Sequence, residues 1–187
     1  MKVHFAAAVD GSKEDYKNIC NLIEKIGHTV VTDHYLNRTI SDIEKETPAE
    51  AELYAKRSMR WIKNADVVVF ETSKPDVSVG YELAVAVNLL KPVVVMYNNE
   101  KAQVPNSIKG VESDKLQIIG YSEHTLEEIL DISLENAHDS QDVRFNFFIS
   151  PAIGNYLDWI SKNKKIPRSV YLRNLIQKDM EENEEYR

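Results

Sequence analysis

The residues best suited to chemistry lie in the run Ser78–Glu82, which reads Ser-Val-Gly-Tyr-Glu. The run opens a predicted helix that follows a buried strand and a short loop. Gly80 has no side chain, so a ligand can approach the backbone closely at this point. The first turn of a helix carries free N–H groups and a partial positive charge, which bind anions. The position of Glu82 in this turn therefore predicts an ionised carboxylate with a lowered pKa.

An ionised and partly desolvated carboxylate beside a sugar can attack the anomeric carbon of a glycoside. The attack passes through an oxocarbenium-like transition state and leaves a covalent glycosyl-enzyme intermediate. The run Ser78–Glu82 is therefore compatible with glycosidic cleavage in which Glu82 would be the nucleophile. The spacing alone favours a simpler alternative, in which Glu82 only stabilises the start of its helix.

The elements that must position this run alternate between strands and helices. Apolar runs predict strands at residues 3–9, 29–32, 66–71, 92–97 and 116–120. Apolar residues at helical spacing predict helices at residues 13–26, 48–64, 78–90 and 125–137. Residues 36–47 and 98–114 are predicted to be loops. This alternation is typical of an α/β fold with a doubly wound, mostly parallel five-stranded sheet, flavodoxin-like or Rossmann-like, whose ligand crevice lies at the carboxyl ends of the strands.

The composition limits the classes of protein and partner. The chain has 187 residues, which suits a medium domain with a small appendage, and its net charge of -7 argues against a surface devoted to nucleic acid. The single cysteine, Cys20, cannot form an internal disulfide or a cysteine-based zinc site. No apolar run approaches the roughly 20 residues of a membrane span, so no membrane association is expected. The early charge at Asp10 argues against a signal peptide, so a cytoplasmic location is expected.

The histidines divide into one candidate and four others. His4 occupies a position in the first predicted strand that should bring it close to Glu82, so it is a candidate catalytic residue. The others have no metal-like spacing, and we expect surface or loop roles for His28, His34, His124 and His138. No metal site is therefore predicted.

The segments Ala65–Glu71, Val79–Ala84 and Lys91–Val94 together resemble the nucleoside 2-deoxyribosyltransferase family. The resemblance is closest to the branch of 2'-deoxynucleoside 5'-monophosphate N-hydrolases, and the opening strand Val3–Val9 fits as well. It covers residues 1–138, which we expect to form the main domain. The resemblance implies that the chain cleaves or transfers the N-glycosidic bond of a nucleoside or nucleotide, as a hydrolase or a transferase.

The resemblance also implies roles for residues around the run. The family glutamate that matches Glu82 is the nucleophile on the anomeric carbon, and Tyr81 and His4 would help to orient it. The residues expected to bind the substrate are Ala7, Asp10, Gly11, Ser58, Asp76, Ser78 and Gly80. The family acts without a metal or an organic cofactor, so the resemblance implies neither here.

The chain departs from the family pattern at several of these positions. His4 stands where the family has a tyrosine near the nucleophile. Ala7–Ala8 and Asp10 stand where the family has a Gly-Ser pair and an arginine, which help to hold the base and the phosphate. Ser58 replaces an aspartate used in positioning or proton transfer, and Asp76 replaces a serine that contacts the phosphate.

These departures bear on the substrate. An aspartate at position 76 would repel a phosphate, although Lys13 and Ser78 are nearby candidates to bind one. Three alternatives follow: a neutral nucleoside, another N-glycoside, or a site that binds a nucleotide but has lost catalysis.

The pattern changes after a polar linker at residues 139–142. Apolar and polar residues alternate over 143–149, which predicts a half-exposed strand, and two helices follow, the second with Ser169 as its N-cap. This strand-helix-helix order over residues 143–183 resembles a ribbon-helix-helix module. The resemblance implies a homodimer or higher homo-oligomer whose paired strands enter the major groove of DNA. The residues that would contact DNA are Arg144, Asn146, Phe148 and Ser169.

Two alternatives remain open for this appendage. It could serve only as a dimerisation clasp, without touching DNA. The whole chain could instead be a sensor, in which a nucleotide-like ligand in a non-catalytic cleft is coupled to a dimeric appendage that binds DNA or a partner protein.

Overall fold

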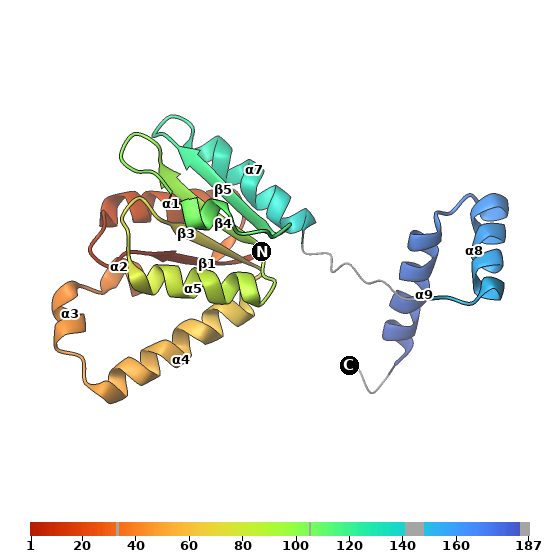
Figure 1. Cartoon of the computed structure of the whole chain (residues 1–187), viewed down its shortest axis with the longest axis horizontal. Coiled ribbons are helices and arrows are strands. Elements are labelled where there is room, and N and C mark those ends of the chain that lie inside the picture. The colour runs from red at the N-terminus through yellow and green to blue at the C-terminus, as the bar shows by residue number, and fades with distance from the viewer. Residues whose placement is uncertain (33, 105, 141–147, 184–187) are drawn as a thin grey trace. The chain divides into compact units, whose positions relative to one another are not determined.

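The computed structural model describes all residues except 33, 105, 141–147 and 184–187, and it describes only the backbone at residues 34, 106 and 107. The chain divides into two compact units, Met1–Val143 and Arg144–Arg187. The larger unit contains the parallel sheet and the candidate site (Figure 1).

The larger unit is built on a five-stranded parallel sheet. Its strands are β1 (Lys2–Ala7), β2 (Thr29–Val30), β3 (Val67–Glu71), β4 (Val93–Asn98) and β5 (Leu116–Tyr121). Their order in the sheet is β2-β1-β3-β4-β5, and every pair is parallel. The doubly wound α/β fold is therefore confirmed. The chain reverses direction across the sheet between β1 and β3, where parallel sheets of this kind place their ligand crevice.

Helices cover both faces of the sheet (Figure 1). They are α1 (Lys13–Lys25), α2 (His34–Asn37), α3 (Ile40–Glu44), α4 (Pro48–Asn64), α5 (Val77–Asn88), α6 (Asn106–Lys109) and α7 (Leu126–Asp139). The prediction of loops at 36–47 and 98–114 was wrong in part, because α3 and α6 lie there. Helices of four or five residues are too short to show an apolar periodicity. Thr39 and Asp42 form the capping box that starts α3.

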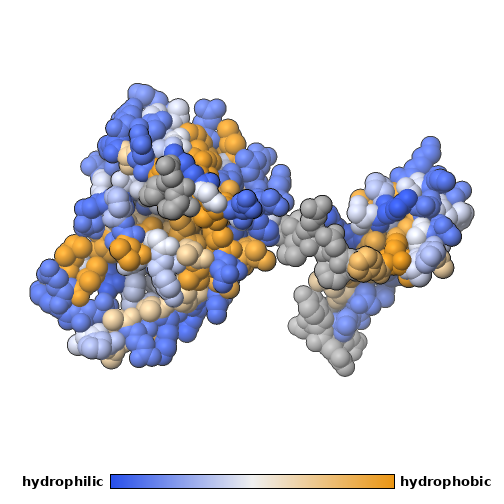
Figure 2. Space-filling view, in the orientation of Figure 1, coloured by the Kyte–Doolittle hydropathy of each residue, from blue (hydrophilic) through white to orange (hydrophobic). Residues whose placement is uncertain are grey.

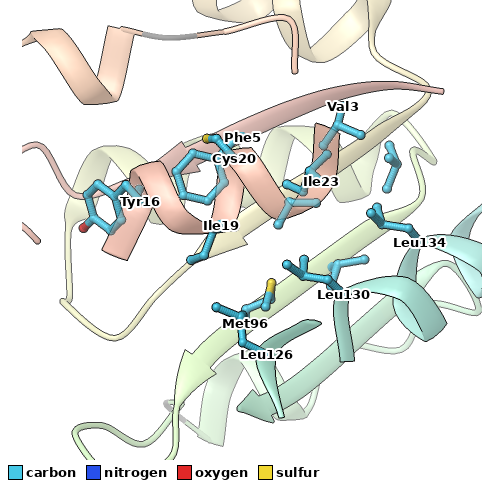
Figure 3. Packing of buried hydrophobic residues seen from close by; sticks show 14 of the residues in the cluster. Val3, Phe5, Tyr16, Ile19, Cys20, Ile23, Met96, Leu126, Leu130 and Leu134 are labelled. Atoms are coloured by element: carbon cyan, nitrogen blue, oxygen red, sulfur yellow. The ribbon is translucent and has the colours of Figure 1, made fainter. Parts of the chain in front are cut away.

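The alternation of side chains along β3 separates two cores. Val67 and Val69 face α1 and α7, whereas Val68 and Phe70 face α4 and α5. Figure 3 shows the first core, where Phe5 of β1 lies among residues of α1 and α7. Because both faces are covered, the central strands read as continuous apolar runs. His4 lies between Val3 and Phe5, so it faces the opposite side, toward α4 and α5.

The smaller unit contains the helices α8 (Pro151–Lys164) and α9 (Arg168–Glu182). Ser150 caps α8, and Lys165 adopts the left-handed conformation that ends it. The N-cap of α9 is Pro167, so the prediction of Ser169 as N-cap was wrong by two positions. Most of the predicted strand 143–149 lies outside the described residues, and the described positions 148–149 are not in a strand. In the described ranges, no helix is both long and apolar enough to cross a membrane.

Candidate active site

Glu82 is buried on α5, with 4% of its surface exposed, and three side chains contact its carboxylate. The hydroxyl of Tyr35 donates to Oε2 at 2.7 Å, and the hydroxyl of Ser58 donates to Oε1. The Nε2 atom of His4 lies 3.7 Å from Oε2. Both carboxylate oxygens are therefore held by side chains from other elements.

The three partners reach Glu82 from three different elements. His4 lies on β1, Tyr35 on α2 and Ser58 on α4. Helices α4 and α5 pack against each other, and α4 also packs against β1. This packing brings together residues that are far apart in the sequence.

The imidazole of His4 is itself oriented by neighbours. Its Nδ1 lies 3.0 Å from the hydroxyl oxygen of Thr32, which also bonds to the backbone of Phe5. The ring of Trp61 stacks on it, with the ring centres 6.2 Å apart and the planes 25° apart. The fully buried imidazole therefore has its Nε2 directed toward Glu82.

The electrostatics of the site favour an ionised Glu82. Burial raises the pKa of Glu82, but the nearby imidazole of His4 and the hydrogen bonds from Ser58 and Tyr35 outweigh this effect, so the pKa is lowered overall. Burial, followed by the charge of Glu82, raises the pKa of Tyr35. The hydroxyl of Tyr35 therefore stays protonated and remains a hydrogen-bond donor.

The prediction that the helix N-terminus lowers the pKa of Glu82 is wrong. Helix α5 begins at Val77, so Glu82 lies beyond its first turn. The effect of the helix dipole is confined to the first turn. The carboxylate of Asp76 occupies this N-terminus instead, accepting bonds from the backbone N–H groups of Ser78 at 2.7 Å and Val79 at 3.1 Å.

A pocket of about 420 Å³ lies along the start of α5. Its walls include Asp76, Val79 and Gly80, together with Lys74 and Lys101 from neighbouring loops. A Cβ atom added at Gly80 would meet open space, so the glycine leaves the backbone accessible there. Glu82 does not line this pocket, because its side chain is directed toward β1 and α4.

A second pocket of about 280 Å³ lies at the carboxyl ends of the strands. It is lined by the first loop and by buried Glu71, whose Oε1 accepts hydrogen bonds from Tyr121 and Ser73. Burial raises the pKa of Glu71. Glu71 faces α1 and α7, on the side of the sheet opposite to Glu82, so the two carboxylates belong to separate environments.

The first loop is shaped by an ion pair and a close contact. Asp10 pairs with Lys74, and the hydrogen bond and charge of Lys74 outweigh desolvation and lower the pKa of Asp10. A Cβ atom on Gly11 would lie 1.7 Å from the hydroxyl of Tyr16, so only glycine fits there. Ala7 is buried beneath the loop at the end of β1.

The structure brings some of the expected site residues together and separates others. His4 and Ser58 contact Glu82, whereas Tyr81 is 63% exposed on α5. Successive residues of a helix point in different directions, so Tyr81 and Glu82 do not share a face.

Among the residues expected to contact DNA, Arg144 and Asn146 lie outside the described residues. Phe148 is exposed in the smaller unit, and Ser169 lies within the first turn of α9.

Sequence reasoning missed Tyr35, whose only signal was its place shortly after the second predicted strand. In the described residues, no group of three or more histidine, cysteine or acidic side chains is placed to hold a metal ion.

Residues 3–143 match the family model described as nucleoside 2-deoxyribosyltransferase. The chain is 29% identical over 134 residues to the 5-hydroxymethyl-dUMP N-hydrolase of Rattus norvegicus, covering 69% of this chain and 82% of that protein. It is 31% identical over 128 residues to a putative 2'-deoxynucleoside 5'-phosphate N-hydrolase 1 of Thermofilum pendens. This match covers 66% of this chain and 87% of that protein.

A solved structure, the CMP N-glycosidase BcmB of Clostridium botulinum, shares this fold. It matches with a TM-score of 0.51 and 16% identity, over 71% of this chain and 97% of that one. The sequence match spans the whole parallel sheet and includes Glu82 with its three partners. On this evidence, the chain belongs to the nucleoside 2-deoxyribosyltransferase family.

Proposed function

We propose that this protein cleaves the N-glycosidic bond of a nucleoside, with Glu82 as the nucleophile, and passes the sugar to water or to a second base. One observation carries the proposal. The carboxylate of Glu82 is buried, has a lowered pKa, and is held at both oxygens by hydroxyl donors. A carboxylate that is both ionised and desolvated is the reactive form for attack on an anomeric carbon.

The proposed reaction has two steps. An oxygen of Glu82 bonds to the anomeric carbon while the C–N bond breaks, and the bonding electrons leave with the base, which takes up a proton. Water, or the N–H of a second base, then attacks the anomeric carbon and loses a proton, and the carboxylate of Glu82 is released. Ser58 and Tyr35 hold the carboxylate throughout, which limits the orientations from which it can attack.

The start of α5 supports a substrate without a 5'-phosphate. In the branch that the chain resembles, a serine at position 76 contacts the phosphate. Here Asp76 is a carboxylate and already accepts the N–H groups of Ser78 and Val79. A phosphate would meet a like charge and find these two donors in use. Asp10, where the family has an arginine, is likewise an anion paired with Lys74.

The test is a matched panel of nucleosides and their 5'-monophosphates, with the released base measured by chromatography. The expected result is base release from one or more nucleosides, little or none from the corresponding monophosphates, and none with Glu82→Ala. The control Glu52→Ala alters an exposed residue of α4 and should keep full activity. Turnover that survives Glu82→Ala contradicts the nucleophile, and ligand binding without turnover supports the sensor alternative.

We further propose that the smaller unit joins two copies of the chain. Helix α9 has no buried residue, and the buried apolar side chains of α8 are Leu157 and Ile160. The apolar side chains exposed on the two helices are Ile153, Tyr156, Trp159, Val170, Leu175, Ile176 and Met180. Figure 2 shows hydrophobic residues at the surface of this unit. A unit of this size needs more burial than it has alone, and a second copy is the commonest source of it.

A further inference from the structure

Tyr35 reaches Glu82 from the short helix α2. Its hydroxyl donates to Oε2 of Glu82 at 2.7 Å, and both side chains are buried. The two residues are 47 positions apart, so the bond depends on where α2 is held. Helix α2 has four residues, and a helix this short has little stability of its own. Something outside α2 must therefore keep Tyr35 in place.

Lys13, the first residue of α1, supplies that contact. Its Nζ donates a hydrogen bond to the backbone carbonyl of Tyr35 and lies 5.9 Å from the centre of the Tyr16 ring. Burial lowers the pKa of Lys13, and the charge of Asp10 opposes this shift. Helix α1 is anchored in the core by Ile19, which is fully buried (Figure 3). Lys13 thus connects α2 to a rigid part of the fold.

The groups that act on Glu82 come from three elements. They are His4 on β1, Tyr35 on α2 and Ser58 on α4. Tyr54 of α4 forms a side-chain hydrogen bond with Tyr35. Each hydrogen bond donated to a carboxylate favours its ionised form, so losing the bond from Tyr35 raises the pKa of Glu82.

We propose that Lys13 and Tyr35 form a clamp that positions the nucleophile: Lys13 holds the backbone of α2, and the hydroxyl of Tyr35 orients Oε2 of Glu82. The clamp rests on the proposed function. It also accounts for the loss of the family tyrosine at position 4, because the hydroxyl beside the nucleophile arrives from α2 instead. Both residues act through Glu82, so they are positioning residues.

The first test removes each contact and records activity against pH. Tyr35→Phe should lower kcat roughly 10-fold to 100-fold, the cost of a lost bond to a charged group, and shift the acid limb of the profile to higher pH. Lys13→Met should also lower kcat and shift the acid limb to higher pH, because the backbone of α2 loses its contact with Lys13. Lys13→Arg keeps a donor for the carbonyl of Tyr35 and should restore much of the activity.

A double variant tests whether the two residues act as one unit. Lys13→Met combined with Tyr35→Phe should be no worse than Tyr35→Phe alone, since the lysine acts through the hydroxyl. Matched controls are Tyr97→Phe on β4 and Lys25→Met, whose side chain is exposed and pairs with Glu127. The clamp is overturned if the losses of kcat in the two single variants multiply in the double variant. It is also overturned if Lys13→Met leaves the acid limb of the pH profile unchanged.

The pKa of Glu82 can be followed without turnover by NMR titration of its labelled carboxyl carbon. The clamp predicts a higher pKa of Glu82 in both Tyr35→Phe and Lys13→Met, with the fold checked by circular dichroism. If the protein cleaves no nucleoside but the pKa of Glu82 rises in both variants, the proposed function fails, and Lys13 and Tyr35 position the Glu82 carboxylate without a catalytic role. If the pKa of Glu82 is unchanged in folded variants, the clamp fails whatever the activity.

Discussion

Ser58 of α4 donates a hydrogen bond to Oε1 of Glu82 on α5, at the opposite end of the carboxylate from the bond that Tyr35 donates to Oε2. The family resemblance of the sequence implies an aspartate at the family position that matches Ser58. A serine donates a hydrogen bond to the carboxylate of Glu82, whereas an ionised aspartate would repel that carboxylate. The substitution therefore changes this contact from a second negative charge to a hydroxyl donor.

Replacing Ser58 tests this contact. Ser58→Ala removes one of the bonds that lower the pKa of Glu82, so kcat should fall about 10-fold and the acid limb should move to higher pH. Ser58→Asp should move the limb in the same direction, because it adds a like charge. Ser133→Ala is the control: Ser133 is also buried, but its hydroxyl bonds to Ile129 on α7. An acid limb common to all four proteins contradicts the role of Ser58.

Replacing Asp76 tests the preference for an uncharged 5' end. Asp76→Ser removes the carboxylate but keeps a good N-cap, so the stability should change by less than about 1 kcal/mol. The ratio of kcat/KM for a 5'-monophosphate to that for its nucleoside should rise at least about 10-fold, since like-charge repulsion is lost. Asp42→Ser, at the start of α3, should leave the ratio unchanged. A ratio that Asp76→Ser does not alter would show that the phosphate is excluded elsewhere.

Glu71 should make stability depend on pH in the opposite sense to Glu82. Burial raises the pKa of Glu71 in the folded state above its ordinary value of 4.5. The contribution of Glu71 to the stability of the folded state is therefore fully present below pH 4.5 and is lost as pH rises through its folded-state pKa. Glu71→Gln removes this titration, so its Tm relative to the unaltered protein should be higher at pH 7 than at pH 4. Thermal unfolding of both proteins at pH 4 and at pH 7 measures these Tm differences. If Glu71→Gln shifts the Tm equally at the two pH values, the role of Glu71 is contradicted.

The exposed face of α9 should control self-association. Ile176→Glu places a charge among exposed apolar residues, so the protein should become monomeric in analytical ultracentrifugation. Lys178→Glu is the control, because Lys178 is exposed and pairs with Glu182 on the same helix. A protein that is already monomeric before substitution contradicts the proposed dimer.

Ile176→Glu and Lys178→Glu also test whether the smaller unit only dimerises or also binds DNA. Duplex DNA bound with a steep salt dependence, and lost in Ile176→Glu, would support the module. Dimerisation without duplex binding would support the clasp alone.

The sequence by itself determined the main strands, the long helices and the α/β class. The apolar run Val67–Phe70 predicted a strand buried on both faces, and the helical spacing from Lys13 predicted α1. These features are local, because a strand or a helix sets its own periodicity within a few residues. The family resemblance added the hypothesis that Glu82 is the nucleophile.

The tertiary structure decided which side chains surround Glu82. Ser58 and Tyr35 lie 24 and 47 positions away from Glu82, and His4 lies on strand β1. Their meeting depends on the sheet order, which puts β1 beside β3, and on the packing of α4 against α5. Local periodicity contains no information about that order. Tyr35 could not be found from the sequence, because α2 is too short to show a pattern and is held by Lys13 from another helix.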